Sequence, residues 1–181
     1  MDPILYVLIT NNHVIDNEDL KQEKEVGLIF DNYGDHKIYK KIKIDKNRKT
    51  YTVYKVGNEI IDLTIIELRL KEDGFDSRNF LKCDDNIMND YAKGVYKSKS
   101  IYLFHYENDK DIVSTSIGKI KEIKDNTITH TCATGMGSSG GPIISYNMKV
   151  IGIHNGRRSD GCKFGSLLQN AIKEYKKKFG I

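Results

Sequence analysis

The chain has 181 residues, which is enough for one compact domain or for two small halves that share an interface. Its formal net charge is +4, from 29 basic and 25 acidic residues that are interspersed along the chain, which disfavours a nucleic-acid-binding module. The 3 cysteines are odd in number and sparse, so they do not form a disulfide framework, and they lack the spacing of a metal site. We therefore expect neither nucleic acid nor a metal ion as a partner.

The longest apolar run near the N-terminus covers residues 4–9. It is too short to span a membrane, and it lacks the basic region and the small-residue cleavage site of a signal peptide. Together with the sparse cysteines, this predicts a soluble cytoplasmic protein without a membrane partner. Nothing in the sequence indicates the oligomeric state.

The first part of the chain is predicted to consist of short strands separated by turns. Residues 37–44 alternate between polar and apolar with a period of two, which is typical of a half-exposed strand. Turn-forming residues interrupt the pattern at 33–35 and 45–47. The predicted strands are residues 4–9, 25–30, 37–44, 50–56 and 59–68.

Two polar residues of this part stand out from their neighbours. His13 follows a Thr-Asn-Asn segment at the end of the first predicted strand, where these residue types favour a turn. A histidine in such a place is more often structural than catalytic when nothing else is known. Asp62 lies between Ile61 and Leu63 in an apolar run, where a carboxylate is costly unless it has a partner. Asp62 therefore requires a partner.

A polar stretch at about residues 82–95 separates this part from the rest, and we place the two halves at residues 1–85 and 86–181. The apolar side chains from Leu167 to Phe179 recur at helical spacing, which predicts a terminal amphipathic helix of about a dozen residues. Many short strands and one helix favour an all-β fold of two small antiparallel barrels. The predicted strands of the second half are residues 100–106, 113–123, 127–132, 142–145, 150–154 and 163–167, with a turn at 155–161.

The segment G-S-S-G-G-P at residues 137–142 cannot lie in the middle of a helix or a strand, because it has three glycines and a proline. It predicts a tight turn that holds two hydroxyl groups. Glycine allows backbone N–H groups to point into a small concavity, as an oxyanion hole requires. The alternative is a Gly/Ser surface turn, but the Gly-Gly-Pro continuation favours a functional turn.

His13, Asp62 and Ser139 occur in the order that a His-Asp-Ser triad has in one class of hydrolases. Such a triad needs a hydroxyl with a base in reach, and an acid that fixes the tautomer of the base. His13 and Asp62 belong to the first half and Ser139 to the second. We therefore expect the site in the cleft between the halves.

Three motifs in this order make the chain similar to the chymotrypsin-like (trypsin-fold) serine proteases and their V8-like group. Residues 10–14 match the T-x-x-H segment of that family, residues 62–66 its D-[apolar]-[small]-[apolar]-[apolar] segment, and residues 137–142 its G-x-S-G-G-P segment. The resemblance covers nearly the whole chain. It implies two antiparallel Greek-key β-barrels followed by a C-terminal helix.

The resemblance also implies a serine endopeptidase that acts on polypeptides through an acyl-enzyme and needs no metal or organic cofactor. Ser139 would be the nucleophile, His13 the general base and then acid, and Asp62 the orienting acid. The backbone N–H groups of Gly137 and Ser139 would form the oxyanion hole. The G-x-S register selects Ser139 over Ser138. Family members with a zymogen switch carry Asp at the position of Ser138, so we expect no activation by insertion of a new N-terminus.

The resemblance further places residues 150–156 along the primary substrate pocket, with His154 and Gly156 on one wall and Thr134 on the other. An imidazole and a hydroxyl can donate to a carboxylate or a carboxamide, as in the Glu- or Gln-cleaving V8-like and viral 3C-type relatives. Ala133 stands where trypsin-like members carry the pocket Asp, which disfavours cleavage after Lys or Arg. The alternative is that His154 is a satisfied strand histidine beside a generic pocket.

Other residues near this pocket are given structural roles. His105 and His130 are interpreted as structural or surface residues. Cys132 and Cys162 flank the predicted pocket, where free thiols are favoured over a disulfide.

The chain departs from the family at its start, because only 12 residues precede His13, which is enough for one strand. We therefore expect a first barrel without its first strand and with an exposed edge. This departure supports an alternative function, a catalytically inactive protease-like domain that binds peptides or serves as a scaffold.

Overall fold

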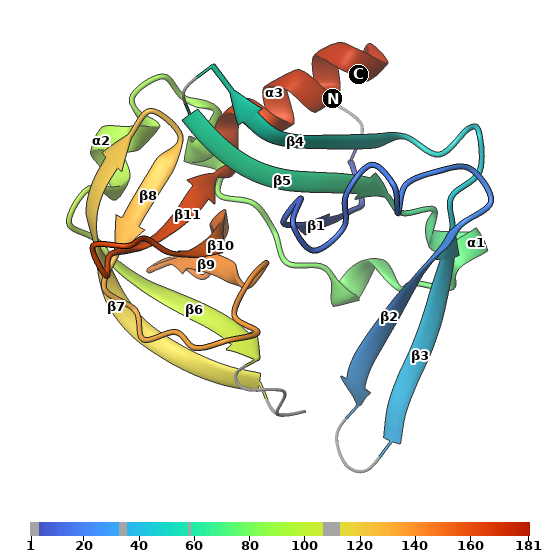
Figure 1. The fold of residues 1–181 in the computed structure, drawn as a ribbon, viewed down its shortest axis with the longest axis horizontal. Coiled ribbons are helices and arrows are strands. Elements are labelled where there is room, and N and C mark those ends of the chain that lie inside the picture. Colours follow the sequence, from blue (N-terminus) through green and yellow to red (C-terminus); the bar gives the residue numbers. More distant parts are fainter. Residues whose placement is uncertain (1–3, 33–35, 58, 107–112) are drawn as a thin grey trace.

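The strands form three sheets in a computed structural model that describes residues 4–32, 36–57, 59–106 and 113–181 (Figure 1). The predicted turn at residues 33–35 lies outside the described residues. Within them, no helix is long and apolar enough to cross a membrane.

The first half contains a three-stranded antiparallel sheet in the order β1-β5-β4 and a separate hairpin of β2 and β3. In Figure 1 the hairpin projects away from the rest of the molecule. Among the described strands this sheet does not close into a barrel, and β1 and β4 are its two edges. The bounds are β1 (Val7–Thr10), β2 (Glu25–Asn32), β3 (His36–Lys43), β4 (Thr50–Val56) and β5 (Glu59–Glu67).

The second half is a closed six-stranded antiparallel barrel in the order β10-β11-β8-β7-β6-β9. Its strands are β6 (Ser100–Tyr106), β7 (Val113–Lys124), β8 (Thr127–His130), β9 (Pro142–Ser145), β10 (Val150–Arg157) and β11 (Lys163–Leu167). Short helical segments connect the halves: α1 (Leu70–Asp73), η1 (Ser77–Asn79), η2 (Asp85–Met88) and α2 (Ala92–Tyr96). The chain then continues from β11 into α3 (Leu168–Phe179).

One hydrophobic core joins the two halves, and β5 is its link. Ile61, Leu63 and Ile65 of β5 pack with the barrel interior and with the buried face of α3. Ile66, on the other face of β5, belongs to a second cluster at the base of the hairpin. Residues 61–66 are all buried, which explains why this strand appears in the sequence as a nearly continuous apolar run.

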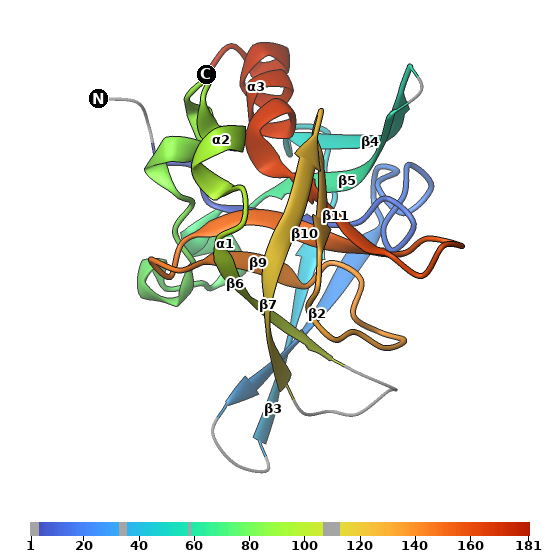
Figure 2. The ribbon, with the colours of Figure 1, turned by 90° about the vertical axis from the view of Figure 1, so that its left-hand side faces the viewer.

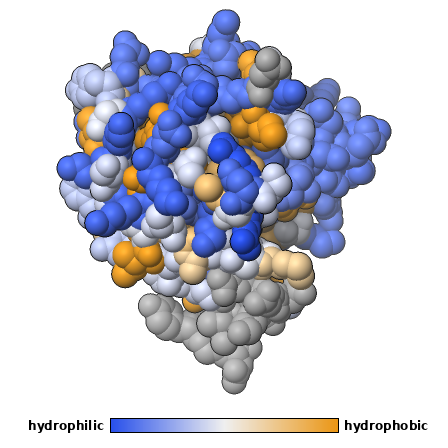
Figure 3. Space-filling model, turned by 60° about the vertical axis from the view of Figure 1, so that its left-hand side comes forward, coloured by the Kyte–Doolittle hydropathy of each residue, from blue (hydrophilic) through white to orange (hydrophobic). Residues whose placement is uncertain are grey.

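Helix α3 closes one side of this core. It lies beside the start of β4 (Figures 1 and 2), where the Tyr175 hydroxyl donates to the carbonyl of Lys49 at 3.4 Å. Gly180 ends the helix in a left-handed conformation, with φ of +64°. Hydrophilic side chains predominate on the face shown in Figure 3, and hydrophobic ones form small separate patches there.

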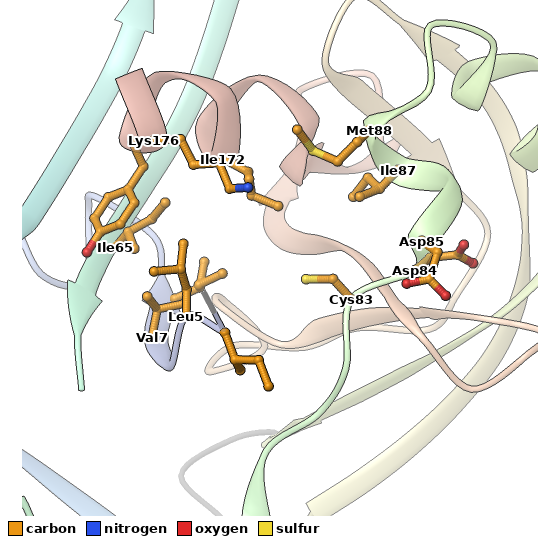
Figure 4. A pocket seen from close by; sticks show the side chains of 13 residues that line it. Leu5, Val7, Ile65, Cys83, Asp84, Asp85, Ile87, Met88, Ile172 and Lys176 are labelled. Atoms are coloured by element: carbon orange, nitrogen blue, oxygen red, sulfur yellow. The ribbon is translucent and has the colours of Figure 1, made fainter. Parts of the chain in front are cut away.

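A groove of about 440 Å³ lies between β1, α3 and the segment that connects the halves. Figure 4 shows Leu5 and Val7 on one side of it, Ile172 of α3 above, and Cys83 opposite. The groove is mainly apolar and adjoins the edge strand β1.

The all-β class, the closed second barrel, the terminal helix and the incomplete first barrel agree with the sequence predictions. Some local predictions were wrong. Strand β1 begins at Val7 rather than at residue 4, and β8 ends at His130 rather than at residue 132. Residues 155–157 were assigned to a turn, but β10 continues through Arg157, because its pairing with β11 extends to Lys163. All three cysteines are free thiols.

Candidate active site

Strand β1 carries the chain to a helical turn that presents His13. The amides of Val14 and Ile15 donate to the Asn11 carbonyl at 3.1 Å, which closes this turn. The side chain of His13 is 41% exposed, whereas the carboxyl group facing it is buried. The imidazole therefore lies at the surface, with the carboxyl group beneath it.

Asp62 of β5 forms two hydrogen bonds with His13. Its Oδ2 lies 2.6 Å from Nδ1 of the imidazole, and its Oδ1 accepts the backbone N–H of His13 at 3.0 Å. Because a carboxylate can only accept, the imidazole proton lies on Nδ1 and Nε2 is left as an acceptor. Nε2 lies 2.9 Å from Oγ of Ser139. The three residues singled out in the sequence thus lie in one hydrogen-bonded chain across the two halves.

The turn that carries Ser139 contains two glycines in the left-handed region, Gly137 at φ +84° and Gly140 at φ +79°. Strand β10 holds its far end, because Gly140 N–H donates to the His154 carbonyl at 2.9 Å and His154 N–H donates to the Gly141 carbonyl at 2.8 Å. Within the described part of the chain, the N–H groups of Gly137 and Ser139 have no hydrogen-bond partner. They remain available to a ligand.

The same turn packs closely against the first half. A Cβ atom on Gly140 would lie 2.9 Å from Oγ1 of Thr10, the last residue of β1. Glycine therefore allows the turn to approach the strand that leads to His13.

Comparison with known proteins places the chain in a family. Residues 2–153 match the model of the trypsin-like peptidase domain. The chain belongs to this family. Solved structures of low sequence identity have a similar fold. At this identity, the similarity is evidence for the fold of the chain and for nothing more. A Glu endopeptidase in complex with MPD has a TM-score of 0.62 and 16% identity, over 97% of this chain and 82% of that one.

Two further structures are similar to the same extent. Deg5 has a TM-score of 0.60 and 13% identity, over 94% of this chain and 77% of the other. The MamO protease domain from Magnetospirillum magneticum has a TM-score of 0.60 and 12% identity, over 93% of this chain and 82% of that domain.

In this trypsin-like peptidase domain, β10 contains a bulge beside the site. Its register with β11 shifts between His154 and Gly156, which leaves Asn155 without an opposite residue. The Asn155 side chain instead turns towards the first half, where it donates to the Ile61 carbonyl at 3.1 Å and accepts from Asn11 at 3.3 Å. The bulge therefore connects the predicted pocket strand to the residue next to Asp62.

The predicted pocket residue His154 is almost fully buried, at 2% exposure. Its Nδ1 lies 3.1 Å from Nε2 of His130, which is buried as well. Burial is the main cause that lowers the pKa of His154 to about 3 and that of His130 to about 4. Both imidazoles are therefore neutral at pH 7.

The other predicted pocket residues differ from His154 in burial and in contacts. Thr134 is half-buried and Ala133 is exposed, with its N–H donated to Ser116 at 2.7 Å. Gly156 pairs with Phe164 after the bulge. None of these residues lines the groove of Figure 4, which lies elsewhere in the molecule. In the described ranges, no cluster of His, Cys, Asp and Glu could hold a metal ion.

Two histidines and one serine have partners that the sequence did not reveal. His105 and His130 are both buried in the barrel, next to Ser138 and His154 respectively. Their only signal was a polar residue inside a predicted strand, which is the signal that singled out Asp62.

Proposed function

We propose that the chain is a serine endopeptidase in which Ser139, His13 and Asp62 form the catalytic triad. The chain of contacts from Ser139 Oγ to His13 Nε2 at 2.9 Å, and from His13 Nδ1 to Asp62 Oδ2 at 2.6 Å, is the observation that carries the proposal. It supplies a hydroxyl, a base whose Nε2 is free to accept, and an acid that fixes the base.

In the proposed reaction, Ser139 Oγ attacks the carbonyl carbon of the scissile peptide while His13 Nε2 takes the hydroxyl proton. The imidazolium then gives this proton to the leaving amine, the C–N bond breaks, and the acyl group stays on Ser139. Water attacks the ester as His13 takes its proton, and return of the proton to Oγ releases the acid. Asp62 stays ionised and stabilises the imidazolium.

The oxyanion of each tetrahedral intermediate would be bound by the N–H groups of Gly137 and Ser139. Their lack of a protein partner supports this role, as does the left-handed backbone of Gly137. Donors that are fixed before the reaction stabilise the developing charge without reorganisation.

For the residue before the cut site we propose Glu or Gln, recognised by His154 and Thr134 with Ala133 and Gly156 beside them. A neutral imidazole keeps one N–H donor, which suits a carboxamide or a carboxyl oxygen. The hydrogen bond from His130 to Nδ1 of His154 would leave that donor on Nε2. One structural neighbour is named a Glu endopeptidase.

A fluorophosphonate probe tests the enzyme proposal, because it labels a serine only when base and nucleophile act together. We expect the wild type to be labelled, and Ser139→Ala and His13→Ala to remain unlabelled while folded. Folded wild type that does not react would contradict the proposal and would favour a peptide-binding or scaffold domain.

Digestion of a peptide library tests the specificity. We expect cleavage after Glu or Gln, and a changed preference in His154→Ala, with Ser139→Ala as the blank. A preference for basic or large aromatic residues would overturn the pocket assignment and leave the triad proposal intact.

A further inference from the structure

Ser138, the residue before the proposed nucleophile, has a buried hydroxyl with two partners. Its side chain is 1% exposed. Oγ accepts the backbone N–H of Gly135 at 3.1 Å and lies 2.8 Å from Nδ1 of His105. Besides accepting from Gly135, Oγ can donate its own proton to Nδ1 of His105 or accept a proton from it.

Apart from its backbone hydrogen bonds, the segment 135–141 has few side chains that could fix its conformation. Four of its seven residues are glycines, and the Met136 side chain is 76% exposed. Glycine visits many backbone conformations at little cost, so a turn of this composition requires contacts that select one of them. Ser138 contributes the one fully buried side chain of the segment.

The backbone contacts of Ser138 are in the same turn. Its N–H donates to the Gly135 carbonyl at 3.3 Å, and its carbonyl accepts from Gly141 at 3.1 Å. The peptide group after Ser138 carries the N–H of Ser139, and the N–H of Gly137 lies one residue before Ser138. A rotation of the Ser138 backbone therefore moves the Ser139 N–H relative to the Gly137 N–H, and these are the two groups assigned to the oxyanion.

His105 anchors this hydroxyl to the barrel. It lies on β6 and is 4% exposed. A Cβ atom on Gly141 would lie 2.7 Å from the Phe104 carbonyl and 3.1 Å from Cβ of His105, so the turn rests directly on this strand. The imidazole thus reaches the turn from a fixed support.

We propose that Ser138 and His105 are positioning residues that hold the turn 135–141 with the N–H groups of Gly137 and Ser139 presented to the oxyanion. This inference rests on the proposed function. It gives Ser138 a role that differs from that of the neighbouring nucleophile. The active form of the turn is then held by a hydrogen bond inside the second barrel.

The test compares labelling rates by a fluorophosphonate, whose phosphoryl oxygen enters the oxyanion hole. Ser138→Ala removes the hydroxyl, His105→Phe keeps a ring without Nδ1, and His105→Asn keeps a hydrogen-bonding atom near the Nδ1 position. Ser145→Ala is the matched control, because Ser145 is another buried serine of the barrel, hydrogen-bonded to the Lys149 carbonyl. Melting temperatures are measured alongside.

We expect Ser138→Ala and His105→Phe to react about 10- to 100-fold more slowly, less than the 10²- to 10³-fold loss from deleting an oxyanion donor. On a p-nitrophenyl ester, kcat should fall and KM should stay. His105→Asn should recover most of the rate, and Ser145→Ala should melt earlier without a slower reaction. If Ser138 and His105 contribute to stability alone, the variants that lack the hydrogen bond should be labelled as fast as those that keep it.

Labelling of Ser138→Ala within twofold of the wild type would overturn the inference. If Ser138→Ala does not fold, the two His105 variants provide the test. Equal labelling rates of His105→Asn and His105→Phe would overturn the inference. If the wild type itself is not labelled, the proposed function has failed instead. Hydrogen exchange at the Gly135 amide then decides: slow exchange that becomes fast in Ser138→Ala supports the hydrogen bond, and unchanged exchange refutes it.

Discussion

At Asp62 the backbone takes a left-handed conformation, with φ of +47°, inside a strand whose neighbours are buried. Such a conformation costs about 1–2 kcal/mol for a residue other than glycine. The hydrogen bonds of its carboxylate with the side chain and the backbone N–H of His13 offset this conformational cost. The strained backbone thus coincides with the residue proposed as the acid of the triad.

Asparagine at this position tests the role of the charge, because Asn tolerates the left-handed region and keeps a similar shape. We expect Asp62→Asn to fold and to be labelled by the fluorophosphonate about 10⁴-fold more slowly, since an amide can donate to Nδ1 and favours the wrong tautomer. Melting temperature serves as the control. Labelling at the wild-type rate would show that His13 does not depend on Asp62.

The buried pair His130 and His154 predicts a pH dependence of stability. Both pKa values lie below the ordinary 6.5, at about 4 and about 3, so between pH 6.5 and 4 the unfolded chain binds more protons than the folded one. The free energy of unfolding should therefore be unaffected above pH 6.5 and fall below it, by about 1.4 kcal/mol per pH unit for each histidine.

Urea unfolding at pH 7.5, 6 and 5 measures this slope. In His130→Phe, the slope of the free energy of unfolding against pH should be smaller by the contribution of one histidine. An unchanged slope in that variant would mean that His130 titrates in the folded protein as it does in the unfolded chain.

Among the elements, the hairpin of β2 and β3 is joined to β5 and α1 by one buried ion pair. Arg48 contacts both carboxylate oxygens of Asp73 at 2.8 Å, and it donates to the carbonyls of Lys43 and Glu67. The side chains are 3% and 5% exposed. Such a pair fixes where the elements meet, because each partner alone would be a buried charge.

Removing one partner tests this link. We expect Arg48→Ala to lower the free energy of unfolding by about 3–5 kcal/mol, since it leaves Asp73 buried without its counter-ion. Arg78→Ala is the control, because the pair of Arg78 with Asp76 is exposed to solvent and should contribute little to stability. Equal losses in urea unfolding would contradict the account.

At the scale of the whole molecule, the site depends on contacts between halves. Asn155 donates to the Ile61 carbonyl and to Ser166, and it accepts from Asn11. We expect Asn155→Ala to lose about 1–3 kcal/mol of stability, because buried polar groups lose their partner, and to be labelled more slowly. Exposed Asn170→Ala should change neither quantity. Lost stability with full labelling would show that the contacts support the fold alone.

Local patterns were enough to predict most strands, the terminal helix and the three residues of the proposed triad, because each has a signal within a few neighbours. Asp62 was conspicuous between apolar residues, and the glycines around Ser139 marked a turn. For the pairs Ser138–His105 and His130–His154, a polar residue inside a predicted strand was the only signal, and it does not identify the partner. Each pair depends on which segments the closed barrel brings together, over separations of 33 and 24 residues.

The open edge of β1 has a consequence for how the molecule fluctuates. Among the described strands, β1 is paired on one side, over the four positions Val7 to Thr10, and it leads directly to His13. Detaching it requires breaking few hydrogen bonds, whereas the second barrel has no free edge to open. We expect amides of β1 to exchange with solvent by a local opening of lower free energy than that of β10. In this opening His13 leaves Ser139 while the barrel stays folded, so the fraction of time in which β1 is docked would limit the rate of the enzyme.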